Sequence, residues 1–522
     1  MYFARKATGL IREVTAKDAW MANIGFMGVG FAFLYITFGP ALFPGVDMIY
    51  ATSLAFIICL FVAIAYALMA ASMPRTGGDY VWTSRIVHPL LGFIAGGIMW
   101  FNLTTWIGLG AKWIAVEGFS MLFWTLGSVL NNPGLQALSQ FPTEVAIVIS
   151  IVIVLLLTFL MLMRIKTTMW VSWGLTVLIF LGLITYLITL GLTGHENFIA
   201  RLTALSGTSP TALITAANSA GYITGITLSG IVWGIFFSVL NFQGFVFSSY
   251  IGGEVKRPER SQVLAIIGSI FTFLIILLVF YGVSYAVVGK DLQHSMAFLA
   301  VSGNEAYPFP WPPYAHFLIY LATSNPIAIT LVNLAFSLTI ILCMIQVYLT
   351  STRLMFAWAF DQVIPASLSS VSRRFGSPYK VTLIVSAIGI VCVFLAYYTG
   401  LLAFSAYQPL MYAIVAWFGG LSALLFPFRK KDVFSAAPPL ARSKLGPIPL
   451  VSLFGLLVVI TQPIIMFATV QPVITGMPIS IEYLTFIVIL VIIAAVYFVA
   501  SYFYNKRRGI DLSLAFREVP PL

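Results

Sequence analysis

Long apolar runs, separated by short polar or glycine- and proline-rich breaks, recur along the whole chain of 522 residues. Each run holds at least the roughly 20 residues that a helix needs to cross the hydrocarbon core of a bilayer. The third and eighth runs are too long for one perpendicular crossing, so we expect tilt or extension beyond the membrane. The predicted spans are 20–41, 48–72, 90–127, 143–163, 169–191, 228–250, 262–288, 327–358, 380–399, 404–427, 448–471 and 480–504.

The composition agrees with an all-α integral membrane protein. Hydrophobic residues make up 60% of the chain, charged residues make up 8%, and the mean hydropathy is +1.01. These values lie outside the range of ordinary globular domains. The four histidines are scattered in loops, and no phosphate-binding loop, catalytic constellation or metal-ligand pattern stands out. We therefore expect neither an enzyme nor a nucleotide-driven pump, and neither a cofactor nor a bound metal.

The positive charges indicate how the spans are oriented. A formal net charge of +11 would suggest nucleic acid as the partner of a soluble protein. If the N-terminus is cytoplasmic, however, all 27 Lys and Arg residues except Lys112, Arg201 and Lys290 fall in cytoplasmic segments. Cytoplasmic loops of membrane proteins carry such an excess of basic residues. The pattern predicts a multi-pass protein of the cell membrane, surrounded by lipid, with both termini cytoplasmic and no nucleic acid partner.

Glycines interrupt the first predicted span. In the stretch NIGFMGVGFAF, Gly28 and Gly30 flank Val29, and residues two apart lie on different faces of a helix. That spacing fits poorly with a seam of small residues between packed helices. The other explanation is a break in the helix, which is tolerated at membrane depth only where the freed backbone groups line a cavity or meet a ligand. The spacing alone leaves both explanations open.

The sixth predicted span contains a second irregular stretch, FFSVLNFQGFVFSSYIGGE. Leu240 is followed by two amides, Asn241 and Gln243, on either side of Phe242 and just before Gly244. The amides bond either to neighbouring helices or to a ligand. Interruptions at corresponding places in spans one and six indicate a five-plus-five inverted repeat, in which substrate binds at the bilayer midplane between two broken helices.

This repeat divides the chain into seven parts. The stretch LIREVTAKDAW, which begins in the first part, is either a short amphipathic helix at the membrane surface or a plain tail. Short helices are expected in the outer segments 192–227 and 289–326. They either take part in gating or serve as packed connectors. The parts are a cytoplasmic N-terminal segment (1–19), a first repeat (20–191), an outer loop (192–227), a second repeat (228–427), a cytoplasmic loop (428–447), two further spans (448–504) and a cytoplasmic tail (505–522).

Three motifs follow spans two, six and eight. They read PRTGGDY at 74–80, GEVKRPER at 253–260, and RLMFA through Asp361 to Pro365 with GSP at 376–378. In order, they resemble Pro-x-Ser/Thr-Gly-Gly-x-Tyr, Gly-Glu-Val-Lys-Asn-Pro-x-Arg, and Arg…Ala…Arg-Asp-Gly…Pro with Gly-Thr-Pro. These are motifs of the amino acid, polyamine and organocation superfamily of transporters, the amino acid permeases. The resemblance covers spans one to ten.

The resemblance implies a leucine-transporter-like fold with two added C-terminal helices, in which a rocking bundle and a scaffold alternate access to one central site. Backbone N–H groups in the first break suit a substrate carboxylate, because they lie at the positive end of a half-helix. Carbonyl groups in the second break suit an ammonium group. The candidate substrate-binding residues are Gly28, Val29, Gly30, Leu240, Asn241, Phe242, Gln243 and Gly244.

The coupling devices of the family do not occur at the corresponding positions. Where some relatives have a proton-linked lysine in span five, this chain has apolar residues, and the Thr-Ser pair of sodium-coupled members falls on Ile341 and Leu342. Ser337 and Thr339 lie one helical turn away and would supply a cation site if the register were shifted. The coupling ion, proton or sodium, therefore stays open.

Polar residues of span three are further candidates. Lys112 and Glu117 lie toward its outer end, where long charged side chains usually extend to the interface. The alternative for this pair is a proton-linked or substrate-sensing role. Asn102 and Thr105 lie deeper in the span and are candidates for lining the pocket.

The sequence favours a secondary transporter, such as a symporter, of neutral or apolar amino acids, driven by a proton or cation gradient. Spans one and six hold no acidic residue, which disfavours a dicationic polyamine as substrate. The alternatives are a permease or exchanger of polyamines or organic amines, and a transporter-like sensor that binds an amino acid without moving it. A channel is disfavoured, because broken helices take the place of polar rows along a pore.

Overall fold

The computed structural model describes residues 8–399, 408–471 and 481–519, and twelve candidate membrane spans occur within them. The predicted number of spans is confirmed, while residues 404–407 and 480 of the predicted spans lie outside the described residues. The spans are built from α1 (Ala16–Met27) with α2 (Ala32–Leu42), α3 (Met48–Ser72), α5 (Pro89–Trp113) with α6 (Ser120–Val129), α8 (Thr143–Leu162), α9 (Ile165–Ser206), α11 (Leu228–Phe242), α12 (Pro258–Val288), α15 (Pro326–Phe360), α16 (Tyr379–Tyr398), α18 (Gln408–Arg429), α21 (Leu450–Thr469) and α23 (Ile481–Arg507).

Shorter elements connect the spans. Short helices are present in both outer segments, as expected there, and Gly194 interrupts α9 with φ +68° and ψ 169° where the span passes into its outer extension. The shorter helices are α4 (Asp79–Ile86), α7 (Pro133–Ala137), α10 (Pro210–Ser219), α13 (Lys290–Val301), α14 (Ala315–Ala322), α19 (Lys431–Ser435), α20 (Pro439–Arg442) and α24 (Leu512–Ala515). The strands β1 (Lys444–Leu445) and β2 (Ile448–Pro449) form one antiparallel pair.

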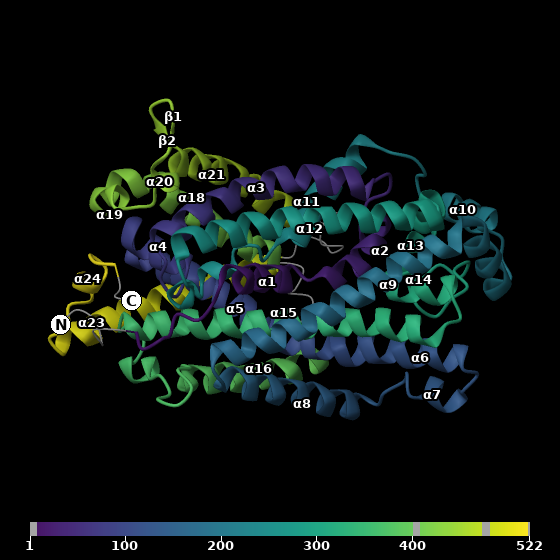
Figure 1. Ribbon diagram of the computed structural model, residues 1–522, viewed down its shortest axis with the longest axis horizontal. Coiled ribbons are helices and arrows are strands. Elements are labelled where there is room, and N and C mark those ends of the chain that lie inside the picture. The colour runs from purple at the N-terminus through teal and green to yellow at the C-terminus, as the bar shows by residue number, and fades with distance from the viewer. Residues whose placement is uncertain (1–7, 400–407, 472–480, 520–522) are drawn as a thin grey trace.

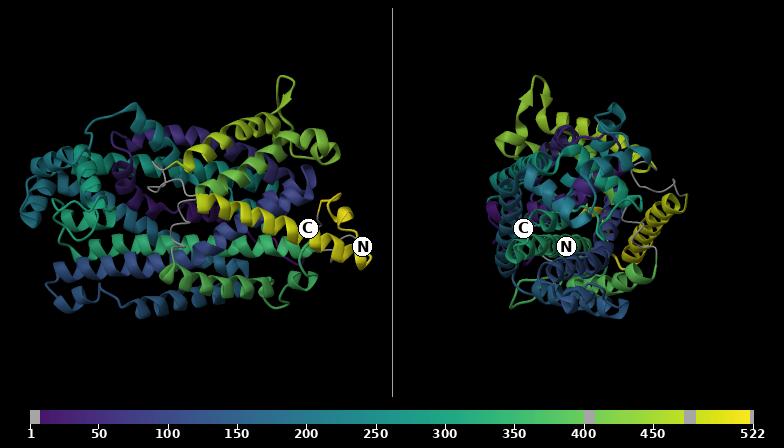
Figure 2. Two further views of the ribbon diagram at one scale, coloured as in Figure 1. Left: turned by 180° about the vertical axis from the view of Figure 1, so that it is seen from behind. Right: turned by 90° about the vertical axis from the view of Figure 1, so that its right-hand side faces the viewer.

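The spans lie side by side along one common direction (Figure 1). The helices α19, α20 and α24 lie at one end of this bundle, here called the terminal side, and α1 begins toward that side. The helices α10, α13 and α14 lie at the other end, the distal side. This arrangement agrees with an even number of crossings. The end-on view in Figure 2 shows α23 at the periphery, where it packs on α5.

Many apolar side chains lie on the outside of the bundle. Leu156 on α8, Val177 on α9, Ile275 on α12 and Val496 on α23 are each more than half exposed. In water such a surface would be an aggregation hazard. In a bilayer, lipid covers it, and the polar groups of the described residues gather in the interior and at the two ends.

The segment before α1 is neither an amphipathic helix nor a free tail. Val14 N–H donates to the carbonyl of Glu254 (3.0 Å), and Lys256 N–H donates to the carbonyl of Val14 (2.8 Å). α1 begins at Ala16 because Thr15 and Asp18 form a capping box, in which each side chain accepts a hydrogen bond from the backbone N–H of the other. The first helix therefore starts four residues before the predicted span.

Candidate functional site

The break predicted at the glycines of the first span is present. α1 ends at Met27, Gly28 takes φ +70°, and a single 3₁₀ turn at Val29–Phe31 leads into α2. A positive φ is readily adopted by glycine and strained for other residues. Gly30 N–H donates to Thr339 Oγ1 on α15 (3.1 Å). A neighbouring helix therefore satisfies one of the backbone donors that the break releases.

The second break follows α11. Its last helical residue is Phe242, Gln243 has an extended backbone, and Gly244 takes φ +119° before a 3₁₀ turn at Phe247–Ser249. A Cβ on Gly244 would lie 2.9 Å from the backbone nitrogen of Met27. The two interruptions therefore lie against each other in the middle of the bundle.

A cavity of about 70 Å³ lies beside both breaks. It continues toward the distal side into a wider space of about 300 Å³, and the two spaces share six residues. The inner cavity is lined by Phe26, Met27, Phe31, Tyr35, Met99, Asn102, Leu103, Trp106, Leu240, Gln243, Phe247, Cys343, Gln408 and Tyr412. The wider space adds Leu34, Phe38, Trp113, Phe237 and Pro409. An apolar wall with a few polar groups and no charged side chain is typical of a site for a small ligand.

Three of the predicted residues, Leu240, Gln243 and Asn102, line the cavity. Asn102 Nδ2 donates to the carbonyl of Gln408 (3.4 Å). Gln243 Nε2 is buried and has no hydrogen-bond partner among the described residues. Leaving a buried donor unsatisfied is costly, so this amide is available for a ligand in the cavity.

Asn241 and Phe242 lie outside the cavity wall. Asn241 Nδ2 donates to the hydroxyl of Tyr281 (3.5 Å), and the Phe242 ring packs edge-on against Phe273. Residues three apart share a face of a helix. Leu240 and Gln243 face the cavity, so Asn241 and Phe242 between them face the neighbouring α12. Their contacts are those of helix packing.

The remaining backbone candidates form the breaks themselves. Gly28, Val29 and Gly30 are buried, and the residues on either side of them, Met27 and Phe31, supply the cavity wall. Any contact of this turn with a ligand would therefore come from the main chain, as the resemblance implies.

The charged and hydroxyl candidates of span three lie away from the cavity wall. Thr105 Oγ1 donates to the carbonyls of Phe101 and Asn102 in its own helix (3.1 and 3.0 Å). Lys112 Nζ donates to the carbonyl of Ala396, near the end of α16 (2.9 Å). Glu117 lies in a π-helical turn that follows α5.

The two hydroxyl candidates of α15 also lack a place in the lining. Ser337 Oγ donates to the carbonyl of Asn333 (3.5 Å), and Thr339 Oγ1 donates to that of Ala335 (2.8 Å) while accepting from the first break. Thr339 therefore supports the broken helix, and its use as a cation ligand stays a prediction.

Several lining residues were not predicted. Met99, Asn102 and Trp106 recur at helical spacing on α5, so the choice of Asn102 on span three could have indicated Trp106 on the same face. Gln408 and Tyr412 come from α18. No comparable pattern marks them, because their place depends on how α18 packs beside the two breaks.

Toward the terminal side, two buried ion pairs close the interior. Arg353 donates to both carboxylate oxygens of Glu254 (2.9 and 3.1 Å), and Arg85 donates to both oxygens of Asp361 (2.5 and 2.7 Å). Tyr80 also donates to Asp361 (2.7 Å). The three sequence motifs supply all of these residues but Arg85, so the motifs meet in one layer.

This terminal layer is separate from the cavity and is held by backbone contacts as well. Gly77 N–H donates to the carbonyl of Tyr250 (2.9 Å), and Thr76 forms a β-bridge with Ile251. Along α15, the cavity residue Cys343 and the ion-pair residue Arg353 are ten positions apart. At about 1.5 Å of helix rise per residue, this is a distance of about 15 Å. The ion-pair layer therefore lies well to the terminal side of the cavity.

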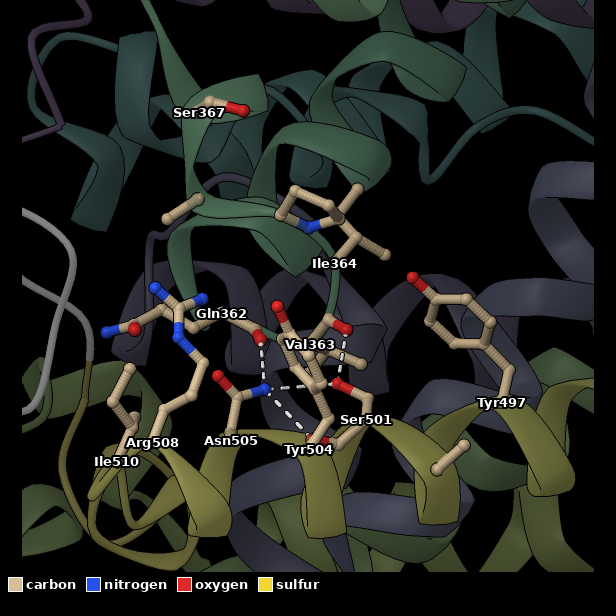
Figure 3. A pocket seen from close by; sticks show the side chains of 13 residues that line it. Gln362, Val363, Ile364, Ser367, Tyr497, Ser501, Tyr504, Asn505, Arg508 and Ile510 are labelled. Atoms are coloured by element: carbon tan, nitrogen blue, oxygen red, sulfur yellow. Dashed lines mark hydrogen bonds between the residues drawn. The ribbon is translucent and has the colours of Figure 1, made fainter.

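A further cavity, of about 610 Å³, lies on the terminal side between α23 and the segment after α15 (Figure 3). Asn505 Nδ2 donates to the carbonyl of Gln362 (3.1 Å), and Ser501 Oγ donates to that of Val363 (2.6 Å). These bonds fix the chain next to Asp361. We therefore assign this wall of α23 a supporting role for the ion-pair layer.

Twelve apolar spans, two of them broken beside a small central cavity, define a membrane protein of the transporter class. Residues 20–495 match the family described as amino acid permease, and the chain belongs to that family.

Curated relatives agree with the family at low identity. The chain is 26% identical to the branched-chain amino acid permease BcaP of Lactococcus lactis subsp. cremoris (strain MG1363) over 345 residues, covering 64% of this chain and 65% of that protein. It is 24% identical to BcaP of Bacillus subtilis (strain 168) over 379 residues, 72% of each. It is also 24% identical to the glutamate/serine transporter AimA of B. subtilis (strain 168) over 303 residues, 56% of this chain and 50% of that protein. The match thus spans slightly less than two thirds of the L. lactis permease.

The buried pair of Arg353 and Glu254 generates a stability prediction. Replacement of Arg353 by Gln should lower the free energy of unfolding by about 3–5 kcal/mol, because it leaves a buried carboxylate unpaired. The double variant Arg353→Gln/Glu254→Gln should recover a large part of the loss. Chemical unfolding in detergent micelles measures both, with Lys431→Gln on the exposed surface as control. A double variant as unstable as the single one would contradict the assignment.

The first break generates a prediction about uptake. Leucine at Gly28 or at Gly30 should abolish uptake while the protein still reaches the membrane. Gly28 has a positive φ, and a Cβ at Gly30 would press on the side chain of Thr339. Gly174→Leu on α9 is the control, because a Cβ there meets no atom within 4 Å. Uptake and membrane abundance are measured in the same cells. Normal uptake by both variants would count against the site.

Proposed function

We propose that the protein is a secondary transporter that carries a neutral, apolar amino acid across the cell membrane by alternating access. The central cavity is the observation that carries the proposal. Its lining combines two helix breaks, an aromatic and apolar wall, and amides, without a formally charged side chain. This combination suits a ligand that is dipolar at one end and apolar at the other.

The main chain supplies the recognition of the dipolar end. The turn from Gly28 to Gly30 stands at the start of the half-helix α2. Its Gly28 and Gly30 N–H groups already donate to Ile24 and Thr339, so the Val29 N–H is the donor we assign to a carboxylate. The end of α11 near Gln243 presents the opposite partial charge, which favours an ammonium group. Because an ionised side chain is costly to keep inside a membrane, backbone groups are the more economical choice for both ends.

The apolar wall favours an aliphatic side chain. Phe31, Trp106 and Leu240 line both the inner cavity and the wider space. Two relatives are named as branched-chain amino acid permeases, which supports leucine, isoleucine or valine as the substrate. A glutamate side chain would meet no cationic group in this lining, so the glutamate named for the third relative is disfavoured here.

The shape of the interior supports alternating access. The cavity widens toward the distal side, whereas the ion-pair layer closes the terminal side. With both termini in the cytoplasm, as the positive charges favour, this conformation faces outward. The inward-facing state then requires the layer to open, and a proton or cation gradient would drive the cycle.

Transport in liposomes tests the proposal. With purified protein reconstituted, uptake of labelled leucine should accelerate when unlabelled leucine is placed inside, because alternating access exchanges the two. Isoleucine and valine should compete strongly, and glutamate and putrescine weakly. Protein-free liposomes are the control. Uptake of putrescine alone would overturn the substrate class, and binding of leucine without flux would favour a sensor.

A further inference from the structure

Asp79 is a buried acid without a cationic partner. Its residue is 1% exposed, and no salt bridge joins it to a described Lys or Arg. Its Oδ2 accepts hydrogen bonds from the hydroxyls of Tyr66 on α3 (2.9 Å) and Tyr250 (2.8 Å), while Oδ1 has no hydrogen-bond partner among the described residues. A carboxylate in such surroundings is costly unless it is paired or becomes neutral.

The cations near Asp79 are engaged with other groups. Tyrosines therefore make up its close titratable neighbours: Tyr66, Tyr250 and, on α18, Tyr412. On α5, which packs along α4, Lys112 lies at the distal end and His88 is exposed. The engaged cations are Arg85 with Asp361, Arg353 with Glu254, Arg75 with the carbonyl of Pro74, and Arg429 with the carbonyls of Ile86 and Val87.

The environment shifts the titration of this carboxyl group. Burial raises the pKa of Asp79 to about 7, against the opposing effect of the Tyr250 and Tyr66 hydroxyls and of nearby N–H groups in α4. The ordinary pKa of this group is 3.8. Between pH 3.8 and about 7, the folded protein therefore holds one more proton on Asp79 than the unfolded chain does. The stability linked to neutral Asp79 is therefore fully present below pH 3.8 and is lost as the pH rises through about 7.

Asp79 also connects the cavity with the terminal layer. Tyr412 lines the cavity, and α18, which carries it, packs on α4, which carries Asp79. Tyr250 lies three residues after the cavity residue Phe247, and their ring centroids are 5.6 Å apart. The carboxyl group thus holds the chain that follows the second break against α4, at the layer that must open in the inward-facing state.

We propose that Asp79 binds and releases the coupling proton, an inference that rests on the proposed function. A hydronium ion transfers a proton to Oδ1, which forms an O–H bond and leaves water and a neutral acid. A neutral acid accepts weaker hydrogen bonds than a carboxylate, so the hold on Tyr250 loosens and residues 247–254 can separate from α4. Opening exposes the acid to water on the terminal side, which takes the proton and restores the carboxylate.

The variant Asp79→Asn tests this assignment. Asparagine is neutral, and its amide oxygen can accept from both tyrosines. In liposomes containing a pH-sensitive dye, leucine-driven proton uptake should fall to background, whereas leucine exchange without net proton movement should persist. Asp432→Asn on the exposed α19 is the matched control, and Glu117→Gln tests the acid of span three that the sequence offers as proton-linked. Wild-type proton movement in Asp79→Asn, or its loss in Glu117→Gln alone, would overturn the proposal.

A second variant keeps the inference testable if Asp79→Asn fails to fold. Tyr250→Phe removes a donor that lowers the pKa, so the midpoint of proton-coupled uptake should move to higher pH. Infrared titration of the purified protein should show a carboxyl band near pH 7 that shifts in the same direction in Tyr250→Phe. An unshifted band contradicts the assignment. Because this band needs no transport, absence of leucine exchange in the wild type would refute the proposed function separately.

Discussion

Every peptide group inside a bilayer needs a hydrogen-bond partner from the protein itself, because lipid offers none. This requirement explains why the two breaks occur where they do. Gly30 N–H donates a hydrogen bond to Thr339, and the second break contacts Met27 at Gly244. Each break is tolerated because other spans surround it, and together they leave the small space that the spans enclose. The position of the cavity thus follows from the hydrogen bonding of the main chain.

Buried charges on the terminal side need partners from the protein in the same way. Buried ion pairs contribute little net stability compared with apolar packing, yet removing one partner is strongly destabilising. A layer built from Arg353, Glu254, Arg85 and Asp361 is therefore well suited to two states, since each pair regains water when it separates. Asp79 differs from these groups because no cation pairs with it in a salt bridge among the described residues, which is why we assign the proton response of the layer to it.

Local pattern was sufficient to predict the spans, because apolar length is a property of short segments. Glycine spacing left the first break open, and the resemblance to the family was needed to predict both breaks. The sequence also indicated Leu240, Gln243 and Asn102, which line the cavity. Contacts across the fold were beyond its reach. Arg85 and Asp361 are 276 positions apart in the chain, and Tyr412 reaches the cavity only through the packing of α18. The motifs were recognised as family marks, while their meeting in one layer required the structure.

Cys343 gives the cavity an intrinsic chemical label. The three cysteines are buried, but Cys343 alone belongs to the described lining, where Trp106 Nε1 donates to its sulfur (3.3 Å). A small thiol reagent that enters the cavity from the distal side would meet this sulfur and no other described cysteine. Occupancy by a ligand would shield it, so the rate of modification reports affinity for ligands that are bound but not moved.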